Sequence, residues 1–238
     1  MTRTESLQLL SRYSLPPNSL GYCGKGSAPE KFKLCIIDGI CDGIEEELTH
    51  FIVLHPYLKT ISALSKKDKF DYEVGECFWL GNDLINSATI EHYELLLNNF
   101  IAQGIPDSFV KELRQKKPKQ FIPFHLFQVL HVGVGKSSGA VPFNLETINN
   151  CMIRWGRVTS IENNFLTADL NSVEIFENKY RLTKIPYRGE FNSKLVPNLK
   201  VGDTISIHWG VVNKILTEKE EQNLSYWSQK TVETVEID

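Results

Sequence analysis

The stretch Met152-Ile-Arg-Trp-Gly-Arg-Val-Thr-Ser-Ile161, followed by Phe165-Leu-Thr-Ala-Asp-Leu170, alternates between apolar and polar positions. A period of two residues is typical of a β-strand with one buried face, so each stretch predicts a strand. Asn163-Asn164 lies between them and predicts the turn of a hairpin. This part of the chain therefore predicts an antiparallel sheet.

The same pattern continues towards the C-terminus. Val173–Phe176 and Lys179–Lys184 predict a second hairpin with Asn178 in its turn, and 204–212 predicts one further alternating strand. A terminal helix is expected to start after Thr217, because Glu220 stands at the spacing of a capping box. Short strands followed by a helix over residues 146–238 predict a small OB-like β-barrel domain.

Upstream of the strands the apolar spacing is helical. Residues 1–117 predict an all-α, bundle-like domain, in which Pro16-Pro17 ends the first helix, Pro56 kinks or splits a long one and Asp107 is an N-cap. Predicted helices cover 8–13, 28–39, 44–64, 71–80, 89–101 and 107–115. Residues 118–145 predict an ordered loop and linker with one short strand at Phe127–His131. The expected fold class is α+β.

Composition sets limits on function. Of 238 residues, 42% are hydrophobic and 23% charged, and the formal net charge is −3, so no overall positive charge would attract nucleic acid. No apolar run approaches the roughly 20 residues that span a bilayer. The first residues lack the apolar core of a secretory signal. We expect a cytoplasmic protein with no nucleic-acid and no membrane partner.

The five cysteines are an odd number at wide spacings, and no Cys-x-x-Cys pair occurs. A disulfide framework and a preformed structural zinc site are therefore not expected. The simplest interpretation is a set of reduced thiols, most of them buried as small apolar residues.

Two residues of the predicted barrel could carry chemistry together. Cys151 stands at the start of the first predicted strand, and His208 lies on the last. A thiolate and an imidazole can hold a metal such as low-spin iron or zinc. They can equally form an activated thiolate–imidazole pair for covalent chemistry, or be a buried cysteine and a packed histidine.

Three upstream residues are further candidates. Cys23 is flanked by glycines in Gly21-Tyr-Cys-Gly24, which suits a close approach to a ligand and equally suits an ordinary tight loop. His125 and His131 are six residues apart, a spacing that shares one face of a strand but not of a helix. Together with Cys23 or Cys151 they would form a metal shell; otherwise their ring nitrogens bond to the backbone.

The segment beginning at Cys151 resembles the small hydrogenase-assembly chaperones of the HypC/HupF type. Those begin with a cysteine, followed by a glycine, a basic residue and valine, as in Cys151-Met-Ile-Arg-Trp-Gly-Arg-Val. Val201-Gly-Asp203, then His208-Trp-Gly-Val-Val, resembles their second signature, and Leu216-Thr-Glu-Lys-Glu-Glu resembles the start of their C-terminal helix. The resemblance covers roughly residues 149–235.

This resemblance implies an OB-like barrel that carries an iron–cyanide–carbonyl fragment for the [NiFe]-hydrogenase large subunit. Cys151 would be the thiolate ligand and His208 the imidazole one. Other maturation proteins or the large subunit would be the partners. The sequence departs from the family pattern in having an internal cysteine and in carrying Trp155 where proline is usual.

Nearly the whole chain also resembles an uncharacterised bacterial family, through motifs such as Pro16-Pro-Asn, Leu20-Gly-Tyr-Cys-Gly24, Trp79-Leu-Gly-Asn82, Pro123-Phe-His-Leu-Phe and Cys151-Met-Ile-Arg-Trp-Gly. This second resemblance implies no activity. Our leading hypothesis is a non-enzymatic carrier of a metal fragment in hydrogenase maturation.

Two alternatives stay open. One is a metal- or thiolate-dependent enzyme whose site lies between the two domains and is lined by Cys23, His125, His131 and Cys151. The other is a plain interaction module, which Trp155 favours.

Overall fold

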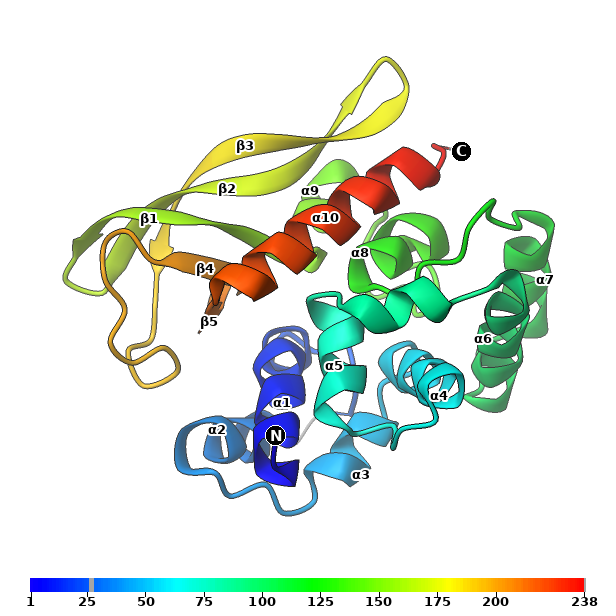
Figure 1. Ribbon diagram of the computed structural model, residues 1–238, viewed down its shortest axis with the longest axis horizontal. Coiled ribbons are helices and arrows are strands. Elements are labelled where there is room, and N and C mark those ends of the chain that lie inside the picture. The colour runs from blue at the N-terminus through cyan, green and yellow to red at the C-terminus, as the bar shows by residue number, and fades with distance from the viewer. Residues whose placement is uncertain (26–27, 238) are drawn as a thin grey trace.

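A computed structural model describes residues 1–25 and 28–237, and it confirms the α+β class (Figure 1). The N-terminal helices form one side of the molecule and the sheet forms the other, with the last helix, α10, along the sheet. The helices are α1 (Arg3–Ser19), α2 (Pro29–Asp38), α3 (Ile44–Thr49), α4 (Leu54–Ser65), α5 (Tyr72–Trp79), α6 (Ile90–Ala102), α7 (Asp107–Gln115), α8 (His125–Phe127), α9 (Leu145–Cys151) and α10 (Glu218–Thr234). A 3₁₀ turn, η1 (Asp83–Ser87), and a π-helical turn, η2 (Gln128–Gly133), complete them.

The strands form a single antiparallel sheet in the order β3-β2-β1-β4-β5. Their bounds are β1 (Arg154–Glu162), β2 (Phe165–Phe176), β3 (Lys179–Glu190), β4 (Thr204–His208) and β5 (Val211–Ile215). Both predicted hairpins are present, and Asn163 and Asn178 have the positive φ angles that their turns require. Tyr187 of β3 donates a hydrogen bond to the Gly210 carbonyl (3.1 Å), which brings β3 to the β4–β5 turn.

The prediction of a single strand over 204–212 is wrong. Trp209 and Gly210 both have positive φ, 49° and 75°, and form a tight turn that separates β4 from β5. Two consecutive residues with positive φ are typical of the turn that joins neighbouring antiparallel strands. The predicted capping box of the terminal helix is present, because Thr217 and Glu220 bond to each other's backbone.

Most of the predicted N-terminal helices are present, with shifted ends. The long helix predicted over 44–64 is two helices, but the break lies before Leu54 rather than at Pro56. Pro56 stands in the first turn of α4, where a missing N–H costs no helical bond. The N-cap of α7 is Pro106, and Asp107 is the first helical residue rather than the cap.

The prediction of a loop with a strand at Phe127–His131 is wrong for the centre of residues 118–145. Residues 125–133 are helical, in α8 and η2, and every residue from Phe121 to Val134 is buried. Their glycines and prolines suggested a loop, but the apolar side chains between them fill the core beside α5 and the sheet.

The prediction that Pro16-Pro17 ends the first helix is also wrong, because α1 continues to Ser19. A proline lacks the N–H that would bond to the carbonyl four residues earlier, so this pair frees the carbonyls of Arg12 and Tyr13. Both carbonyls accept bonds from the sheet instead: Asn213 Nδ2 donates to Arg12 (2.6 Å) and His208 Nδ1 donates to Tyr13 (2.8 Å). The prolines thus turn two helix-internal bonds into bonds between the helical part and the sheet.

Helices and sheet also share one apolar core. A cluster of buried side chains runs from Leu7 and Tyr13 of α1 through Trp79 to Trp155 and Val173 of the sheet. The Tyr13 hydroxyl lies 2.9 Å from Ser206 Oγ of β4 in this core. A smaller cluster joins side chains of the sheet to one from the segment between β3 and β4: Val158, Leu166, Ala168, Leu170, Val196, Ile205, Ile207 and Val212.

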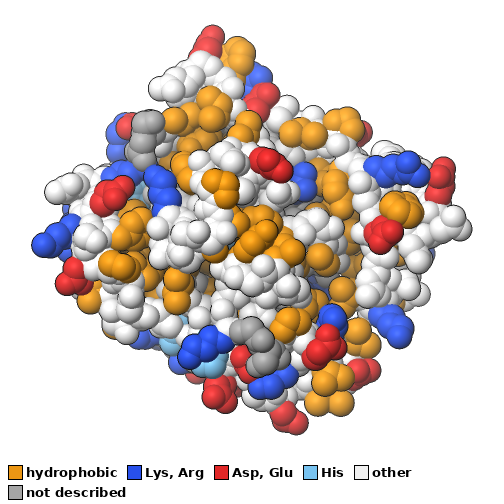
Figure 2. All heavy atoms as spheres, turned by 180° about the vertical axis from the view of Figure 1, so that it is seen from behind, with side chains coloured by type: hydrophobic (Ala, Val, Ile, Leu, Met, Phe, Trp, Pro, Cys, Tyr) orange, Lys and Arg blue, Asp and Glu red, His pale blue; other side chains and the backbone are white. Residues whose placement is uncertain are grey.

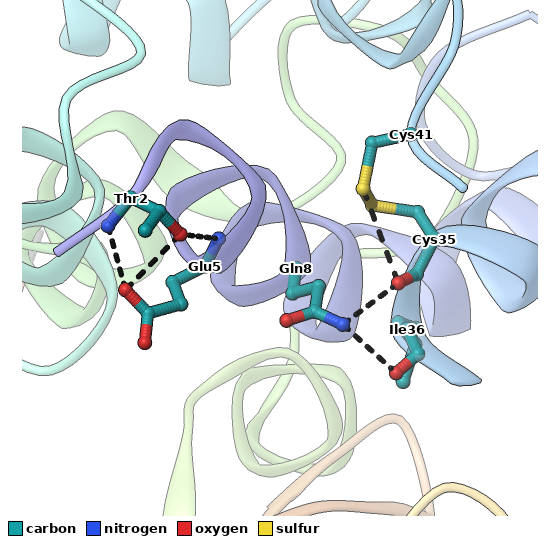
Figure 3. The surroundings of a disulfide bond; sticks show 6 residues. All are labelled: Thr2, Glu5, Gln8, Cys35, Ile36 and Cys41. Atoms are coloured by element: carbon teal, nitrogen blue, oxygen red, sulfur yellow. Dashed lines mark hydrogen bonds between the residues drawn. A yellow bond between two sulfur atoms is a disulfide. The ribbon is translucent and has the colours of Figure 1, made fainter. Parts of the chain in front are cut away.

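One pair of cysteines departs from the expected reduced state. Cys35 of α2 and Cys41 form a disulfide, and Gln8 donates a hydrogen bond to the Cys35 carbonyl (3.0 Å) beside it (Figure 3). Cys23, Cys77 and Cys151 are free thiols. The spacing of the cysteines along the sequence did not predict this disulfide. The two residues come together only because the chain turns back after α2.

The surface is mixed in character. On the face shown in Figure 2, Lys and Arg side chains alternate with Asp and Glu, and apolar side chains gather towards the centre. Among the described residues, no helix is both long enough and apolar enough to cross a membrane.

Because Pro16 frees the Arg12 carbonyl for Asn213, the effects of substituting Pro16 and Asn213 on stability should depend on each other. Asn213→Ala should lower the free energy of unfolding by about 1–3 kcal/mol, because it leaves the Arg12 carbonyl without the donor that the buried Asn213 side chain supplies. In a Pro16→Ala background the restored N–H can bond to that carbonyl, so the same substitution should cost less. Urea unfolding of the four proteins in this double-mutant cycle checks it. Equal costs of Asn213→Ala in both backgrounds would contradict the assignment.

Candidate metal centre

Three of the sequence-predicted candidates meet in one buried cluster: His125, Cys151 and His208. Each stands at the end of an element, His125 at the start of α8, Cys151 at the end of α9 and His208 at the end of β4. Their potential ligand atoms all lie within 4.8 Å of one another. Cys151 Sγ and His125 Nε2 are 3.9 Å apart.

Hydrogen bonds fix the orientation of His208. Its Nδ1–H donates to the Tyr13 carbonyl that Pro17 leaves free (2.8 Å), so Nε2 carries the lone pair. Nε2 is buried and has no hydrogen-bond partner among the described residues. A histidine that bonds to a backbone carbonyl through one nitrogen and offers the other is the usual arrangement of a metal ligand.

His125 is held in a similar way. Its Nε2–H donates to the Cys151 carbonyl (2.8 Å), and Nδ1 is buried without a hydrogen-bond partner in the described structure. Its ring lies edge-on to that of His208, with the centroids 5.3 Å apart. Each imidazole of the cluster thus has one buried nitrogen without a hydrogen-bond partner among the described residues.

Two tryptophans enclose the cluster. The Trp79 ring, at the end of α5, lies 4.6 Å from the His125 ring and 5.5 Å from the His208 ring, centroid to centroid. Trp209 follows His208 in the tight turn, where its backbone N–H donates to the Asn150 carbonyl (2.7 Å) and the Tyr22 ring packs on its indole (4.7 Å between centroids). A pocket of about 70 Å³ lies beside these side chains, several times the space that one water needs. It is lined by Tyr22, Trp79, His125, His208 and Trp209 among others.

Cys23 lies on the wall of the same pocket, in the turn that follows α1. Asn18 donates to its carbonyl (2.9 Å) and holds this turn. The residue is exposed, but neighbouring protein atoms limit hydration of the thiol and raise its pKa to about 11. The structure therefore places Cys23 beside the cluster, not within the triad.

His131 belongs elsewhere. Its Nε2 lies 2.9 Å from the Tyr93 hydroxyl, which donates to the Leu113 carbonyl, and its ring stacks on Phe127. The helical conformation of this segment points His131 and His125 in different directions, as a six-residue spacing on a helix requires. The suggestion that the two histidines share one metal shell is therefore wrong.

Burial decides the charges in the cluster. It raises the pKa of the Cys151 thiol well above its ordinary value and lowers the pKa of His125 to about 4. The pKa of His208 is also far below its ordinary value, through burial first and the neighbouring His125 second. Near neutral pH the three groups are a thiol and two neutral imidazoles.

A neutral thiol beside two neutral imidazoles is better suited to binding a metal than to covalent catalysis. A thiolate–imidazolium pair would need two charges in a desolvated pocket, whereas two lone pairs and one displaceable thiol proton suit a cation. Tetrahedral zinc, with bonds of about 2.3 Å to sulfur and 2.0–2.1 Å to nitrogen, sets those atoms about 3.5 Å apart. The potential ligand atoms of the three residues all lie within 4.8 Å of one another, which is near the separation that a bound metal requires.

Sequence reasoning missed the two tryptophans and the proline pair. Trp79 lies in Trp79-Leu-Gly-Asn82, and Trp209 directly follows His208, so both were visible as aromatic residues within motifs. Pro16-Pro17 inside a helical pattern was visible too, but its role depends on which donors the sheet brings to the freed carbonyls.

The sequence profile of a family described as "Family of unknown function (DUF6390)" matches residues 2–237. The chain belongs to this family. No curated protein and no solved structure matches the chain. The DUF6390 match spans both the helical residues and the sheet, so it includes all three residues of the cluster.

The lowered pKa of His125 predicts acid sensitivity. An unfolded histidine titrates near 6.5, so below that pH protonation favours the unfolded chain until His125 itself titrates near 4. Stability should fall across this window, by up to about 3 kcal/mol from His125, and His208 acts in the same direction.

His125→Gln should make this fall shallower, in urea-unfolding free energies measured from pH 7 to pH 4.5. His92→Gln is the matched control, because His92 is partly exposed in the first turn of α6 and glutamine can take over its place in the capping box. An unchanged slope in His125→Gln would show that His125 is not buried in its neutral form.

Proposed function

We propose that this protein is a non-enzymatic accessory protein of [NiFe]-hydrogenase maturation that carries an iron fragment bearing cyanide and carbonyl. The supporting observation is the position of Cys151 and His208. These two residues correspond to the cargo contacts of the HypC/HupF chaperones that the C-terminal segment resembles, and they lie in one buried cluster together with His125.

The chemistry of the donors supports a soft or borderline metal. A thiol sulfur and imidazole nitrogens favour iron or zinc over magnesium or calcium, which take oxygen ligands. Three protein donors leave coordination positions for other ligands, and the pocket beside them has room for small ones. A carrier needs such a partly filled site, because its cargo arrives and leaves with ligands already attached.

In this proposed carrier, the N-terminal helical part contributes residues to the metal site. The internal Cys151 is packed against α8 and α5 instead of standing at a free chain start, so the helices supply His125 and Trp79 to the site. The proposed partners are other hydrogenase-maturation proteins or the hydrogenase large subunit, and the proposed location is the cytoplasm.

A resident metal enzyme is the second candidate. The pocket next to an incomplete donor set favours it, because catalytic metal sites keep an open position for substrate. The raised thiol pKa and the lowered histidine pKa values argue against the covalent thiolate version of this candidate.

The carrier proposal is tested on protein made together with a hydrogenase-maturation system and purified without oxygen. Wild type should contain stoichiometric iron and show infrared bands of metal-bound cyanide and carbonyl. Cys151→Ala should lose both signals, and His208→Ala should lose most of the iron. Cys77→Ala, a buried thiol outside the pocket, should keep them.

Circular dichroism of each variant separates loss of metal from loss of fold. Stoichiometric zinc without cyanide and carbonyl bands would favour the enzyme. Wild type that is free of metal and co-purifies with no maturation protein would overturn the carrier proposal.

A further inference from the structure

We propose that Trp79 and Trp209 recognise the non-protein ligands of the bound metal by donating their indole N–H groups to them. This inference rests on the proposed function, since it concerns what the metal in the His125–Cys151–His208 cluster carries. It assigns the pocket to small, metal-bound ligands that end in a hydrogen-bond acceptor, such as cyanide.

Unpartnered polar atoms in the pocket carry the inference. Trp79 Nε1 and Trp209 Nε1 are buried without a hydrogen-bond partner in the described structure, as are His125 Nδ1 and His208 Nε2. All four residues line the one pocket that also contains Cys151. Leaving a buried polar group unpaired costs about 1–3 kcal/mol, so a group of four at one place indicates a missing ligand.

The four atoms are of two kinds. An indole nitrogen can only donate a hydrogen bond, whereas the two free imidazole nitrogens offer lone pairs. A bare cation would satisfy the imidazoles and leave both indoles unpaired. An anion alone would satisfy the indoles and meet the imidazole lone pairs unfavourably. A metal with acceptor-ended ligands satisfies all four.

The positions of the indoles agree with this role. Trp79 lies against both imidazole rings, at 4.6 Å and 5.5 Å between centroids. Trp209 lines the same pocket as Cys151 and directly follows His208 in the chain. A ligand bound to a metal in the cluster would therefore lie in the pocket that both indoles line.

The other walls restrict the class of ligand. No Lys or Arg is among the described residues that line the pocket, and most of the lining is apolar. A phosphate or carboxylate would lack the cationic partner that such anions require. Small ligands whose charge is neutralised by the metal itself fit the pocket of about 70 Å³ better.

The experiment uses the full chain loaded with Co²⁺ in place of iron and azide as the acceptor-ended probe. The thiolate-to-cobalt absorption band reports metal binding, and its change on titration reports azide binding. Trp79→Phe and Trp209→Phe keep an aromatic ring but remove the N–H. Each should leave the Co²⁺ affinity unchanged and weaken azide about tenfold or more, the range expected for a hydrogen bond to a charged group.

Trp227→Phe is the matched control, because Trp227 is buried in α10 and does not line the pocket. It should leave both affinities unchanged. Cobalt binding with unchanged azide affinity in both pocket variants would overturn the role of the indoles and leave the metal site standing. Absence of the cobalt band in wild type would overturn the metal site and, with it, this inference.

Discussion

The bond between His208 Nδ1 and the Tyr13 carbonyl is the interaction on which the site depends. Pro17 removes the helical N–H that would otherwise take that carbonyl, and β4 supplies the imidazole instead. The bond ties the first helix to the sheet and selects the form of His208 whose Nε2 lone pair faces the cluster. The hydrogen bond from Asn213 Nδ2 to the Arg12 carbonyl links the first helix to the sheet in the same way, one residue earlier in the helix.

Burial gives the cluster its chemistry. A thiol and two imidazoles near the surface would exchange protons with water, but in this pocket desolvation keeps all three neutral. Neutral lone pairs in an apolar surround bind a metal cation without prior loss of charge from the histidines. The indole N–H groups of Trp79 and Trp209 are buried in the same pocket without a hydrogen-bond partner among the described residues.

Local patterns predicted most of the fold, since hairpins and caps depend on a few neighbouring residues. Asn163-Asn164 and the Thr217–Glu220 capping box are examples. Predictions were wrong where tertiary contacts override a local preference. Pro16-Pro17 stays helical because the sheet satisfies the freed carbonyls, and residues 125–133 are helical because they fill the core. The Cys35–Cys41 disulfide also depends on how the chain turns after α2.

For the site, the sequence by itself determined which residue types are available: a cysteine before the first strand and a histidine on a later one. Only the tertiary structure decided that His125 joins Cys151 and His208, whereas His131 bonds to Tyr93 and Cys23 stays on the pocket wall. The physical reason is that ligand distances depend on how helix ends and strand ends converge. No periodicity along one segment encodes that convergence.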